Sequence, residues 1–417
     1  MKRAFDLLTA LVKWLAILLP LSAAIGSASA FFLWSMKLVT ETRFSHPWLL
    51  YFLPLGGLAT GLLYRYYGST AAAGNNLLID EIHKPGAGVP RRLAPLVLLC
   101  TLITHLFGGS AGREGTAVQM GGGIAATWAR WLRLDAGTVR ILLMVGVAAG
   151  FGSIFGAPVA GAIFALEVLM VGRMQYEALI PCFFAALVAD WTTHAWGVHH
   201  AMYVVKVAAT GYHTDLLLLS KVVLAGVLFG GAARLFSVAS HRVSHGFQKW
   251  IPAAPLRPMV GGLLVIALVW IVGTPDYLGI GDMAPREGTI TLGAFFTEAT
   301  LPASAWFWKL AFTVITLSSG FKGGEVTPLF FIGAALGHAL SGIMGVPVDF
   351  LAALGFVAVF AGATNTPVAS TFLGMELFGA DHVIYIAAAC LVAYCCSGHS
   401  GIYSSQRIAI PKFRPYT

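Results

Sequence analysis

The sequence predicts an all-α integral membrane protein that contains two structural repeats with discontinuous helices. Three observations support this prediction. The composition is too apolar for a soluble domain, blocks of sequence recur in the same order in the two halves of the chain, and many apolar segments are short or interrupted by glycine-rich turns. Membrane transporters are often built from such repeats, with the second inverted in the bilayer, and we expect two inverted repeats here.

The composition indicates a single membrane domain. Of the 417 residues, 58% are hydrophobic and 11% are charged, whereas about 25% of the residues of a soluble domain are charged. Apolar runs recur from end to end, so we expect one membrane domain over residues 1–417, with no cytosolic domain at its C-terminus. The first run, residues 10–33, exceeds the core of a signal peptide and should remain as a helix.

The net charge of +8 has a simple explanation in a membrane protein. Lysines and arginines gather near both termini and between apolar runs, as at Lys2, Arg3, Arg91, Arg92, Arg130, Arg133, Arg140, Arg407, Lys412 and Arg414. Basic residues in these places mark cytoplasmic loops and interfacial anchors. We therefore expect both termini to be cytoplasmic, with the lipid bilayer as a partner and no nucleic acid partner.

Neither the cysteines nor the histidines predict a metal centre. The five cysteines lie in apolar surroundings without a C-x-x-C motif, which favours reduced structural residues. Four histidines lie near predicted segment boundaries without the spacing of metal ligands, namely His83, His199, His200 and His213. We expect no metal ion and no cofactor.

Two blocks carry the internal repeat most clearly. Residues 112–116 read G-R-E-G-T, and residues 323–327 read G-G-E-V-T, so glycine, glutamate and threonine match. The block G-V-A-A-G-F-G-S-I-F-G-A-P-V-A-G-A-I-F-A-L-E-V-L at 146–169 likewise matches residues 355–378 in its first glycine, its proline and its late glutamate. The two matches have nearly the same offset, and such repetition predicts repeated architecture.

The repeats are expected over residues 50–210 and 221–403, with helices that do not all cross the bilayer. Residues 94–107 are too few to span a hydrocarbon core of about 30 Å, which needs about 20 residues. Segments 116–131 and 326–344 follow polar, glycine-rich turns directly. Non-helical backbone at this depth is tolerated only inside protein or along a cavity, so we expect broken helices whose ends meet near the midplane.

These turns predict an anion site. A helix that starts near Thr116 would expose unpaired N–H groups behind Gly112 and Gly115, and helix N-termini attract anions. The second turn should place the start at Val326 in the symmetric position. Candidate anion-binding residues are therefore Gly112, Arg113, Gly115, Thr116, Val326 and Thr327.

Glu114 is itself an anion at that place. We expect it to occupy the site when it is ionised and to leave when it is protonated, so that a proton and an anion compete. A simpler interpretation is that Glu114 pairs with Arg113 and only holds the turn together. Glu325 lies in the symmetric turn and is a candidate for a second carboxylate of the pathway.

Four motifs resemble the CLC family of anion channels and antiporters. G-R-E-G, followed after two residues by V-Q-M-G-G, is similar to the gating-glutamate motif of that family. Residues 156–169 resemble its glycine- and proline-centred helix pair, 323–337 its second anion loop, and 401–406, G-I-Y-S-S-Q, the segment of its central tyrosine. The resemblance covers nearly the whole chain and implies a homodimer of inverted-repeat subunits, with Tyr403 as an anion ligand.

Departures from the family pattern resemble its bacterial fluoride/proton antiporter branch. Chloride members have G-S-G-I-P where this chain has A-G-N-N-L at 73–77, and G-x-F-x-P where it has G-E-V-T-P at 324–328. Chloride/proton antiporters carry two successive glutamates where this chain has Glu167 and then Val168. The branch implies export of cytoplasmic fluoride across the bacterial inner membrane in exchange for protons, coupled by Glu114 and Glu325 and with Asn75 near the anion.

Other interpretations are kept at this stage. A chloride channel or a chloride/proton antiporter is the first alternative. G-x-S-G at 398–401 and G-x-S-x-G at 108–112 resemble nucleophile motifs of serine proteases, but an intramembrane protease would not explain the repeated glutamates, and we expect no enzyme. R-E-G-T at 286–289 is expected to be a loop. Glu167 and Glu376 are expected either to cap helices or lie at an interface, or to relay protons.

Overall fold

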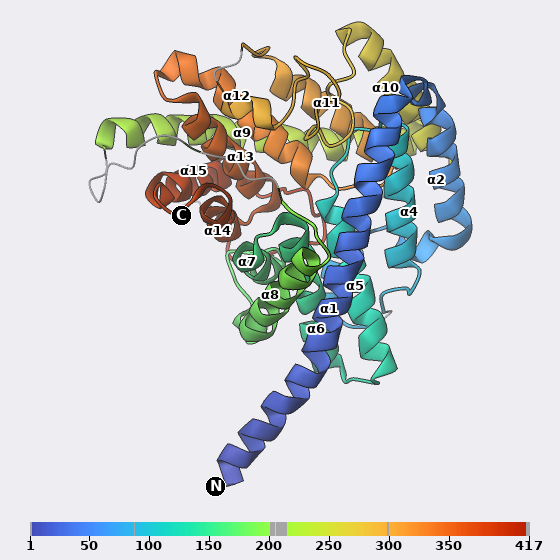
Figure 1. Ribbon diagram of the computed structural model, residues 1–417, viewed down its shortest axis with the longest axis vertical. Coiled ribbons are helices and arrows are strands. Elements are labelled where there is room, and N and C mark those ends of the chain that lie inside the picture. The colour runs from blue at the N-terminus through green and yellow to red at the C-terminus, as the bar shows by residue number, and fades with distance from the viewer. Residues whose placement is uncertain (1, 87, 201–204, 206–214, 298–299, 414–417) are drawn as a thin grey trace.

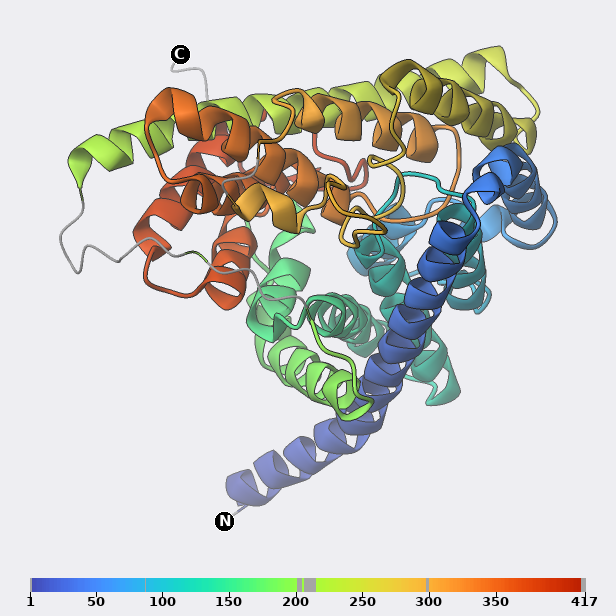
Figure 2. The same cartoon turned by 45° about the horizontal axis from the view of Figure 1, so that its top comes forward.

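The computed structural model describes residues 2–86, 88–200, 205, 215–297 and 300–413. Over these residues the chain forms a helical bundle, in which the helices of the first half stand beside those of the second (Figure 1). Figure 2 shows the long helix α9, Leu216–Trp250, lying across the second half of the molecule. The expected all-α class is confirmed.

The elements follow one another in the same order in both halves. The first half contains α1 (Lys2–Ser45), α2 (Leu53–Tyr67), α3 (Asn75–His83), α4 (Leu93–Leu106), α5 (Glu114–Trp131), α6 (Ala136–Phe155), α7 (Pro158–Glu167) and α8 (Leu179–Ala195). The second half contains α9, α10 (Leu256–Val272), α11 (Ala305–Ser318), α12 (Val326–Met344), α13 (Val348–Thr364), α14 (Pro367–Phe378) and α15 (Val383–Cys396). Helices α4 to α8 thus correspond in order to α11 to α15.

Short elements complete the described chain. They are the 3-10 helices η1 (Pro47–Phe52), η2 (Ser69–Ala71), η3 (Tyr176–Ala178) and η4 (Gly293–Phe296), and the strands β1 (Met170–Val171) and β2 (Arg407–Ile408). The two strands pair in parallel, so the C-terminal segment lies beside the end of α7. The five cysteines are free, as expected.

Helix lengths agree with a membrane domain of discontinuous helices. Six helical segments of the described residues are long and apolar enough to cross a membrane, among them Leu11–Ser45, which contains all but the first residue of the first apolar run. By contrast, α4 and α11 have 14 residues each, which at 1.5 Å per residue reach only about 21 Å. The expected end of the first repeat, residue 210, lies outside the described residues, so the division at 50–210 and 221–403 stays a prediction.

One predicted boundary was wrong by two residues. We expected a helix start near Thr116, but α5 begins at Glu114. The reason is that the amide of Ala117 donates to the carbonyl oxygen of Arg113 at 3.1 Å, which draws Glu114 and Gly115 into the first turn. The start of α12 at Val326 is as expected.

Two symmetric glycine pairs let the central helices cross closely. Helices α5 and α6 meet at Gly121 and Gly146, where a Cβ on either glycine would overlap the backbone of the other. Helices α12 and α13 meet in the same way at Gly333 and Gly355. Small residues allow such backbone contact between membrane helices. Helix α13 is buried from Phe350 to Thr364, so these crossings form the centre of the protein.

Glutamates join the two halves by capping each other's helices. Glu167, at the end of α7, accepts hydrogen bonds from the first amides of α14, those of Val368 and Ala369, at 3.1 and 2.8 Å. Glu376, near the end of α14, accepts from the first amides of α7 at 2.9 and 2.8 Å. Between capping and proton relay, the structure therefore favours capping for both residues. The reciprocal pattern is what a twofold relation between repeats produces.

The caps predict a loss of stability when one carboxylate is removed. Glu376→Ala leaves two amides at the start of α7 without their acceptor, which should cost about 1–3 kcal/mol. We expect a lower midpoint of thermal unfolding in detergent than for wild type. Glu287→Ala, at an exposed loop position, is the matched control. Equal midpoints for the two variants would contradict the capping role.

Candidate functional site

The site is built where the two glycine-rich turns meet. The amide of Gly112 donates to the carbonyl oxygen of Gly324 at 2.6 Å, and the amide of Gly324 donates back to Gly112 at 2.8 Å. This two-residue antiparallel bridge joins the turn before α5 to the turn before α12. The N-termini of two helices from different repeats are therefore held together in the interior of the protein.

Glycine is required at this junction because the backbones touch. A Cβ on Gly324 would lie 2.7 Å from the amide nitrogen of Gly115 and 3.1 Å from that of Glu114. A Cβ on Gly112 would lie 2.7 Å from Oε2 of Glu114. Real Cβ atoms essentially never come within 3.0 Å of a backbone atom, so a side chain at Gly324 would push the two turns apart. Gly115 belongs to the same contact, because a Cβ there would lie 3.1 Å from Cα of Gly324.

Glu114 reaches across the bridge to the start of the other helix. Its carboxylate accepts a hydrogen bond from the backbone amide of Thr327 at 3.2 Å and another, very short, from the Thr327 hydroxyl. The Arg113 amide also donates to it at 3.1 Å. The side chain is 1% exposed. Glu114 therefore holds the N-terminus of α12, where the partial positive charge of a helix favours an anion.

Glu325 and Asn75 gather at the start of α5. A Cβ on Gly115 would lie 3.1 Å from Nδ2 of Asn75 and 3.5 Å from Oε2 of Glu325, so both side chains face that glycine. Oε2 of Glu325 and Oδ1 of Asn75 are buried, and neither has a hydrogen-bond partner among the described residues. An amide and a carboxylate that can each accept a further hydrogen bond thus lie together at the N-terminus of α5.

The position of Asn75 is set by a glycine turn and by a lysine of the second repeat. Gly74 precedes α3 with φ +58°, a conformation that favours glycine. Lys322, from the second repeat, donates to the carbonyl oxygen of Ala72 at 3.3 Å and lies 4.1 Å from the ring centre of Tyr64. The turn that carries Asn75 is therefore fixed before α3 begins.

Tyr403 lies in a buried segment that is tied to both repeats. The Ile402 amide donates to Ala363 at 2.8 Å, and the Ser405 amide donates to Oδ1 of Asn76 at 3.0 Å. Tyr403 is 7% exposed, and its phenol lies in the electrostatic field of Glu325 and Glu114. Sequence reasoning missed Asn76, whose signal was its position next to Asn75.

Arg113 connects Glu114 to an acidic partner that sequence reasoning did not find. Its Nε lies 3.6 Å from Oε1 of Glu114, and its Nη1 lies 3.3 Å from Oδ2 of Asp282. The simpler interpretation, a pair between Glu114 and Arg113, is therefore present together with the capping of α12. Its signal in the sequence is weak, because only the dipeptide Gly281-Asp282 in the second half resembles Gly74-Asn75 in the first.

A buried lysine anchors the loop that carries Asp282. Lys309 of α11 donates to the carbonyl oxygens of Tyr277 and Gly279 at 3.1 and 2.8 Å. The Gly279 amide in turn donates to Gly109 at 3.2 Å, beside the first turn. Lys309 thereby sets the position of Asp282 relative to Arg113. The R-E-G-T sequence at 286–289 lies in the same loop, outside any helix, as expected.

Two cavities share lining residues in the neighbourhood of Glu114. A cavity of about 340 Å³ is lined by Arg113, Asp282, His200 and part of α1. A smaller one of about 50 Å³ shares these three residues and is also lined by Glu114, Thr327 and Phe330. Glu114 therefore lines a small cavity that shares three lining residues with a larger one.

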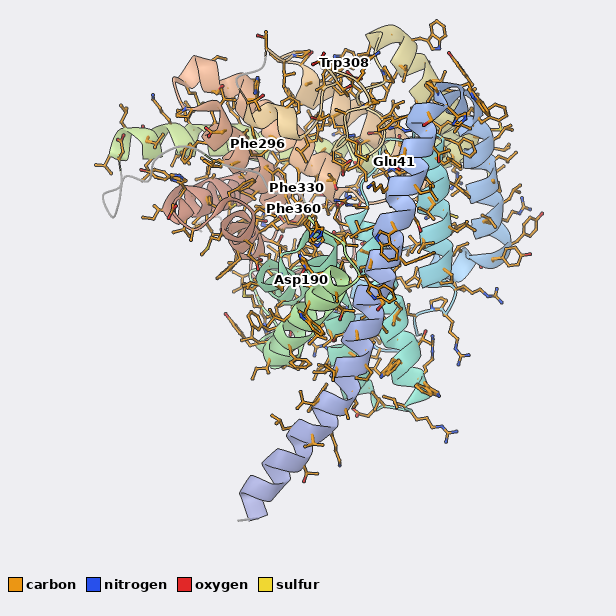
Figure 3. The ribbon with its side chains drawn as sticks, in the orientation of Figure 1. Glu41, Asp190, Phe296, Trp308, Phe330 and Phe360 are labelled. Atoms are coloured by element: carbon orange, nitrogen blue, oxygen red, sulfur yellow. The ribbon has the colours of Figure 1, made fainter. Side chains whose placement is uncertain are left out.

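Aromatic rings line the interior beyond this chamber. Phe330 stacks on Phe356 with ring centres 4.0 Å apart and meets Phe360 at 5.3 Å. Figure 3 shows Phe330 and Phe360 close together in the middle of the molecule. Phe164 continues the series, 5.9 Å from Phe360 and 6.5 Å from Tyr403. A row of rings thus connects the neighbourhood of Glu114 to that of Tyr403.

The remaining predicted residues are placed as follows. Thr116 is buried, and its hydroxyl lies 2.8 Å from that of Thr101 on α4. Val326 is the first residue of α12, with a buried side chain. The structure therefore gathers Glu114, Arg113 and Thr327 at α12, and Asn75, Gly115 and Glu325 at α5.

Comparison with known proteins identifies the family. Residues 56–398 match the family described as voltage gated chloride channel. The chain belongs to this family, the CLC family. Its members are channels and antiporters rather than enzymes, which confirms the expected class and sets aside the protease alternative.

Individual CLC proteins resemble the chain over nearly its full length. A chloride/fluoride channel protein of Pseudomonas syringae pv. tomato is 46% identical over 411 residues, which cover 98% of this chain and 89% of that protein. A solved CLC-type fluoride/proton antiporter has a TM-score of 0.90 at 34% identity and covers 96% of this chain and 98% of its own. The chain shares its fold with a cyanobacterial chloride/proton antiporter, with a TM-score of 0.78 at 20% identity over 94% of this chain and 96% of that one.

Proposed function

We propose that the protein is a fluoride/proton antiporter that exports fluoride from the cytoplasm. One observation carries the proposal, namely the carboxylate of Glu114 on the N-terminus of α12, hydrogen bonded to the amide and hydroxyl of Thr327. The names of two similar CLC proteins, a chloride/fluoride channel and a fluoride/proton antiporter, support fluoride as the substrate.

In this mechanism the carboxylate of Glu114 and the transported anion compete for the same position at the N-terminus of α12. The oxygens of ionised Glu114 stand where a transported anion would accept the same hydrogen bonds. Protonation removes the charge that the helix N-terminus attracts, and the side chain can then leave. Fluoride then takes the amide and hydroxyl of Thr327. Return of Glu114 as an anion releases its proton and expels fluoride, so that each ion's movement requires the other's.

Glu325 provides the second carboxylate of the proposed pathway. It faces the start of α5 beside Asn75, and its Oε2 is buried without a hydrogen-bond partner among the described residues. Since Glu167 caps α14 and is followed by Val168, Glu325 is better placed than this segment to move protons. A buried carboxylate oxygen without a hydrogen-bond partner can take up a proton. Glu325 would do so across the Gly112–Gly324 bridge from Glu114.

Selection of fluoride is assigned to hydrogen-bond donors. Fluoride is small and strongly hydrated, so a site must replace many bonds to water. The Asn75 amide offers two N–H groups where a serine offers one O–H, and Thr327 adds its hydroxyl. A site built around donors discriminates strongly against a ligand that leaves them unpaired. Chloride transport, as a channel or an antiporter, is the alternative, and relative flux separates the two.

We also infer the surroundings of the molecule. Basic side chains gather around the link between α5 and α6, where Arg130 and Arg133 line one cavity with Glu81 and Gly88. Positive loops favour the cytoplasmic side, so this end and both termini are placed in the cytoplasm of a bacterium, with the domain in the inner membrane. Family resemblance supports a homodimer, which the mass of the purified protein in detergent would test.

Glu114→Gln should uncouple protons from the anion. Glutamine keeps the size of glutamate but can neither carry the charge nor exchange the proton, so we expect fluoride-driven proton uptake into liposomes to vanish while fluoride flux changes. Fluoride and proton electrodes record both fluxes. Glu287→Gln, at an exposed position, should behave like wild type. Proton movement that survives Glu114→Gln would sink the coupling role.

Glu325→Gln should impair coupled exchange. The amide preserves the packing over Gly115 and loses the titratable oxygen. We expect proton flux per unit of fluoride gradient to fall, measured in the same liposomes beside the Glu287→Gln control. If the fluxes stay at the wild-type level, Glu325 has only a structural role.

Asn75→Ser should lower the ratio of fluoride to chloride flux. The shorter side chain leaves a larger site with one donor fewer, which suits the larger and less hydrated ion. Each lost donor is worth about 0.5–1.5 kcal/mol, or about a factor of 2 to 13 in the ratio. The two fluxes from one preparation serve as each other's control. An unchanged ratio, in protein that still transports, would remove Asn75 from the selective site.

A further inference from the structure

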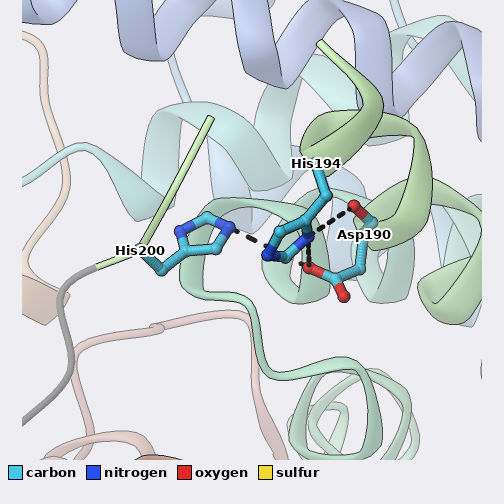
Figure 4. Close-up of side chains that lie close together, drawn as sticks. All are labelled: Asp190, His194 and His200. Carbon is cyan, nitrogen blue, oxygen red and sulfur yellow. Dashed lines mark hydrogen bonds and ion pairs between the residues drawn. The ribbon is translucent and has the colours of Figure 1, made fainter. Parts of the chain in front are cut away.

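Two histidines and an aspartate converge beside the path to Glu114. Asp190 and His194 lie four residues apart on α8, so they share one face of the helix. His200 lies five residues beyond the end of α8 and returns to the same face. Figure 4 shows the three side chains pointing toward one another. One nitrogen or oxygen atom from each lies within 4.8 Å of the other two.

The chain after α8 is folded so that His200 comes back. Gly197, with φ +76°, ends the helix, and its amide donates to His194 at 2.8 Å while the Val198 amide donates to Thr193 at 3.4 Å. Val198 is 8% exposed and packs with a cluster that includes residues of α1 and α6. This turn is therefore held by the core, and His200 is carried with it.

His200 is also fixed from the side of its ring. Gly156, the left-handed residue that ends α6, faces the imidazole, and a Cβ there would lie 2.9 Å from Cγ of His200. The His200 side chain is 10% exposed. Its Nε2 is buried and has no hydrogen-bond partner among the described residues, and the same holds for Oδ1 of Asp190. Two buried ligand atoms thus face each other, 3.9 Å apart, with their capacity unused.

We propose that Asp190, His194 and His200 form a binding site for a divalent transition-metal ion, such as Zn²⁺, at the mouth of the ion pathway. Two imidazoles and a carboxylate are a ligand set that zinc takes, with a fourth position left for water or an anion. The lack of ligand spacing in the sequence led us to expect no metal, because His200 reaches the cluster only through the turn at Gly197. His213 lies outside the described residues.

The distances suit a tetrahedral ion after a small contraction. Ligand atoms bound to zinc at 2.0–2.1 Å lie about 3.3 Å apart. Nδ1 of His194 lies 3.4 Å from Oδ1 of Asp190. Nδ1 also lies 3.0 Å from the backbone oxygen of Asp190, a contact that metal binding would replace. Nε2 of His200 lies 3.9 Å from Oδ1 of Asp190, so these two ligand atoms have to come closer by about 0.6 Å to reach the spacing around zinc.

The location gives the ion a means to control transport. His200 lines both the larger cavity and the small chamber that contains Glu114. A metal ion bound to His200, Asp190 and His194 would link the segment that lines both cavities to α8. It would also add positive charge near Arg113. We expect it to slow ion exchange, because this segment could no longer adjust when Glu114 moves. This effect rests on the proposed transport function, whereas the binding site does not.

The binding test uses full-length protein purified without a histidine tag. Calorimetric titration with Zn²⁺ should show one ion per chain, and Asp190→Asn and His194→Ala should each weaken binding at least about tenfold. Asn preserves the shape of Asp, and His194 is 44% exposed, so both variants should fold. His199→Ala, at the exposed neighbouring histidine, is the matched control and should bind as wild type does. Absent binding by wild type, or equal binding by all variants, would overturn the site.

The transport test compares each protein with its own metal-free rate. Zn²⁺ added to liposomes should slow exchange by wild type and His199→Ala, a chelator should restore it, and His194→Ala should not respond. Binding with no change in rate would overturn the control of transport while leaving the site. Zn²⁺ binding is measured without transport, so a failure to bind contradicts only the metal site. Failure of the metal-free wild type to exchange fluoride for protons would instead contradict the proposed function.

Discussion

The reciprocal hydrogen bonds between Gly112 and Gly324 are the constraint on which the rest of the structure depends. They force two helix N-termini, α5 and α12, to meet in the middle of an apolar protein. The N–H groups of two first helical turns and two partial positive charges are thereby concentrated where water is scarce. Such a place is costly unless anionic or polar groups occupy it. The paired glycines therefore create a place that requires negative charge. The glutamates and the transported anion supply that charge.

The glutamates meet this need by exchange between the two repeats. Glu114 belongs to α5 but caps α12, and Glu325 precedes α12 but faces the start of α5. Farther from the centre, Glu167 and Glu376 exchange caps between α7 and α14. One rule, that each N-terminus at the repeat interface takes its carboxylate from the opposite repeat, covers all four. The outer pair is satisfied by two amides each and holds the fold together.

The inner pair, Glu114 and Glu325, differs from the outer pair, Glu167 and Glu376, in ways that suit transport. Glu114 receives one bond from a hydroxyl and lines a small cavity that shares lining residues with a larger one. Glu325 keeps an oxygen without a hydrogen-bond partner among the described residues. Groups with incomplete or replaceable hydrogen bonds can be displaced at lower cost than the outer caps. Lys309 and Lys322 hold the loops of Asp282 and Asn75 through hydrogen bonds to backbone oxygens, which would keep the surroundings rigid during the proposed movement of the carboxylates.

The sequence by itself determined the membrane class, the order of repeated elements and the central residues, because each leaves a local mark. Apolar runs, glycines before a helix and a glutamate between them can be read without knowing what lies opposite. Only the tertiary structure decided the partners. That Glu114 binds Thr327 and not merely Arg113, that Thr116 bonds Thr101, that Asp282 holds Arg113, and that His200 joins Asp190 all depend on contacts between distant segments. Side-chain partners across an interface follow from the relative placement of whole helices, and the pairing of the two glycine turns sets that placement.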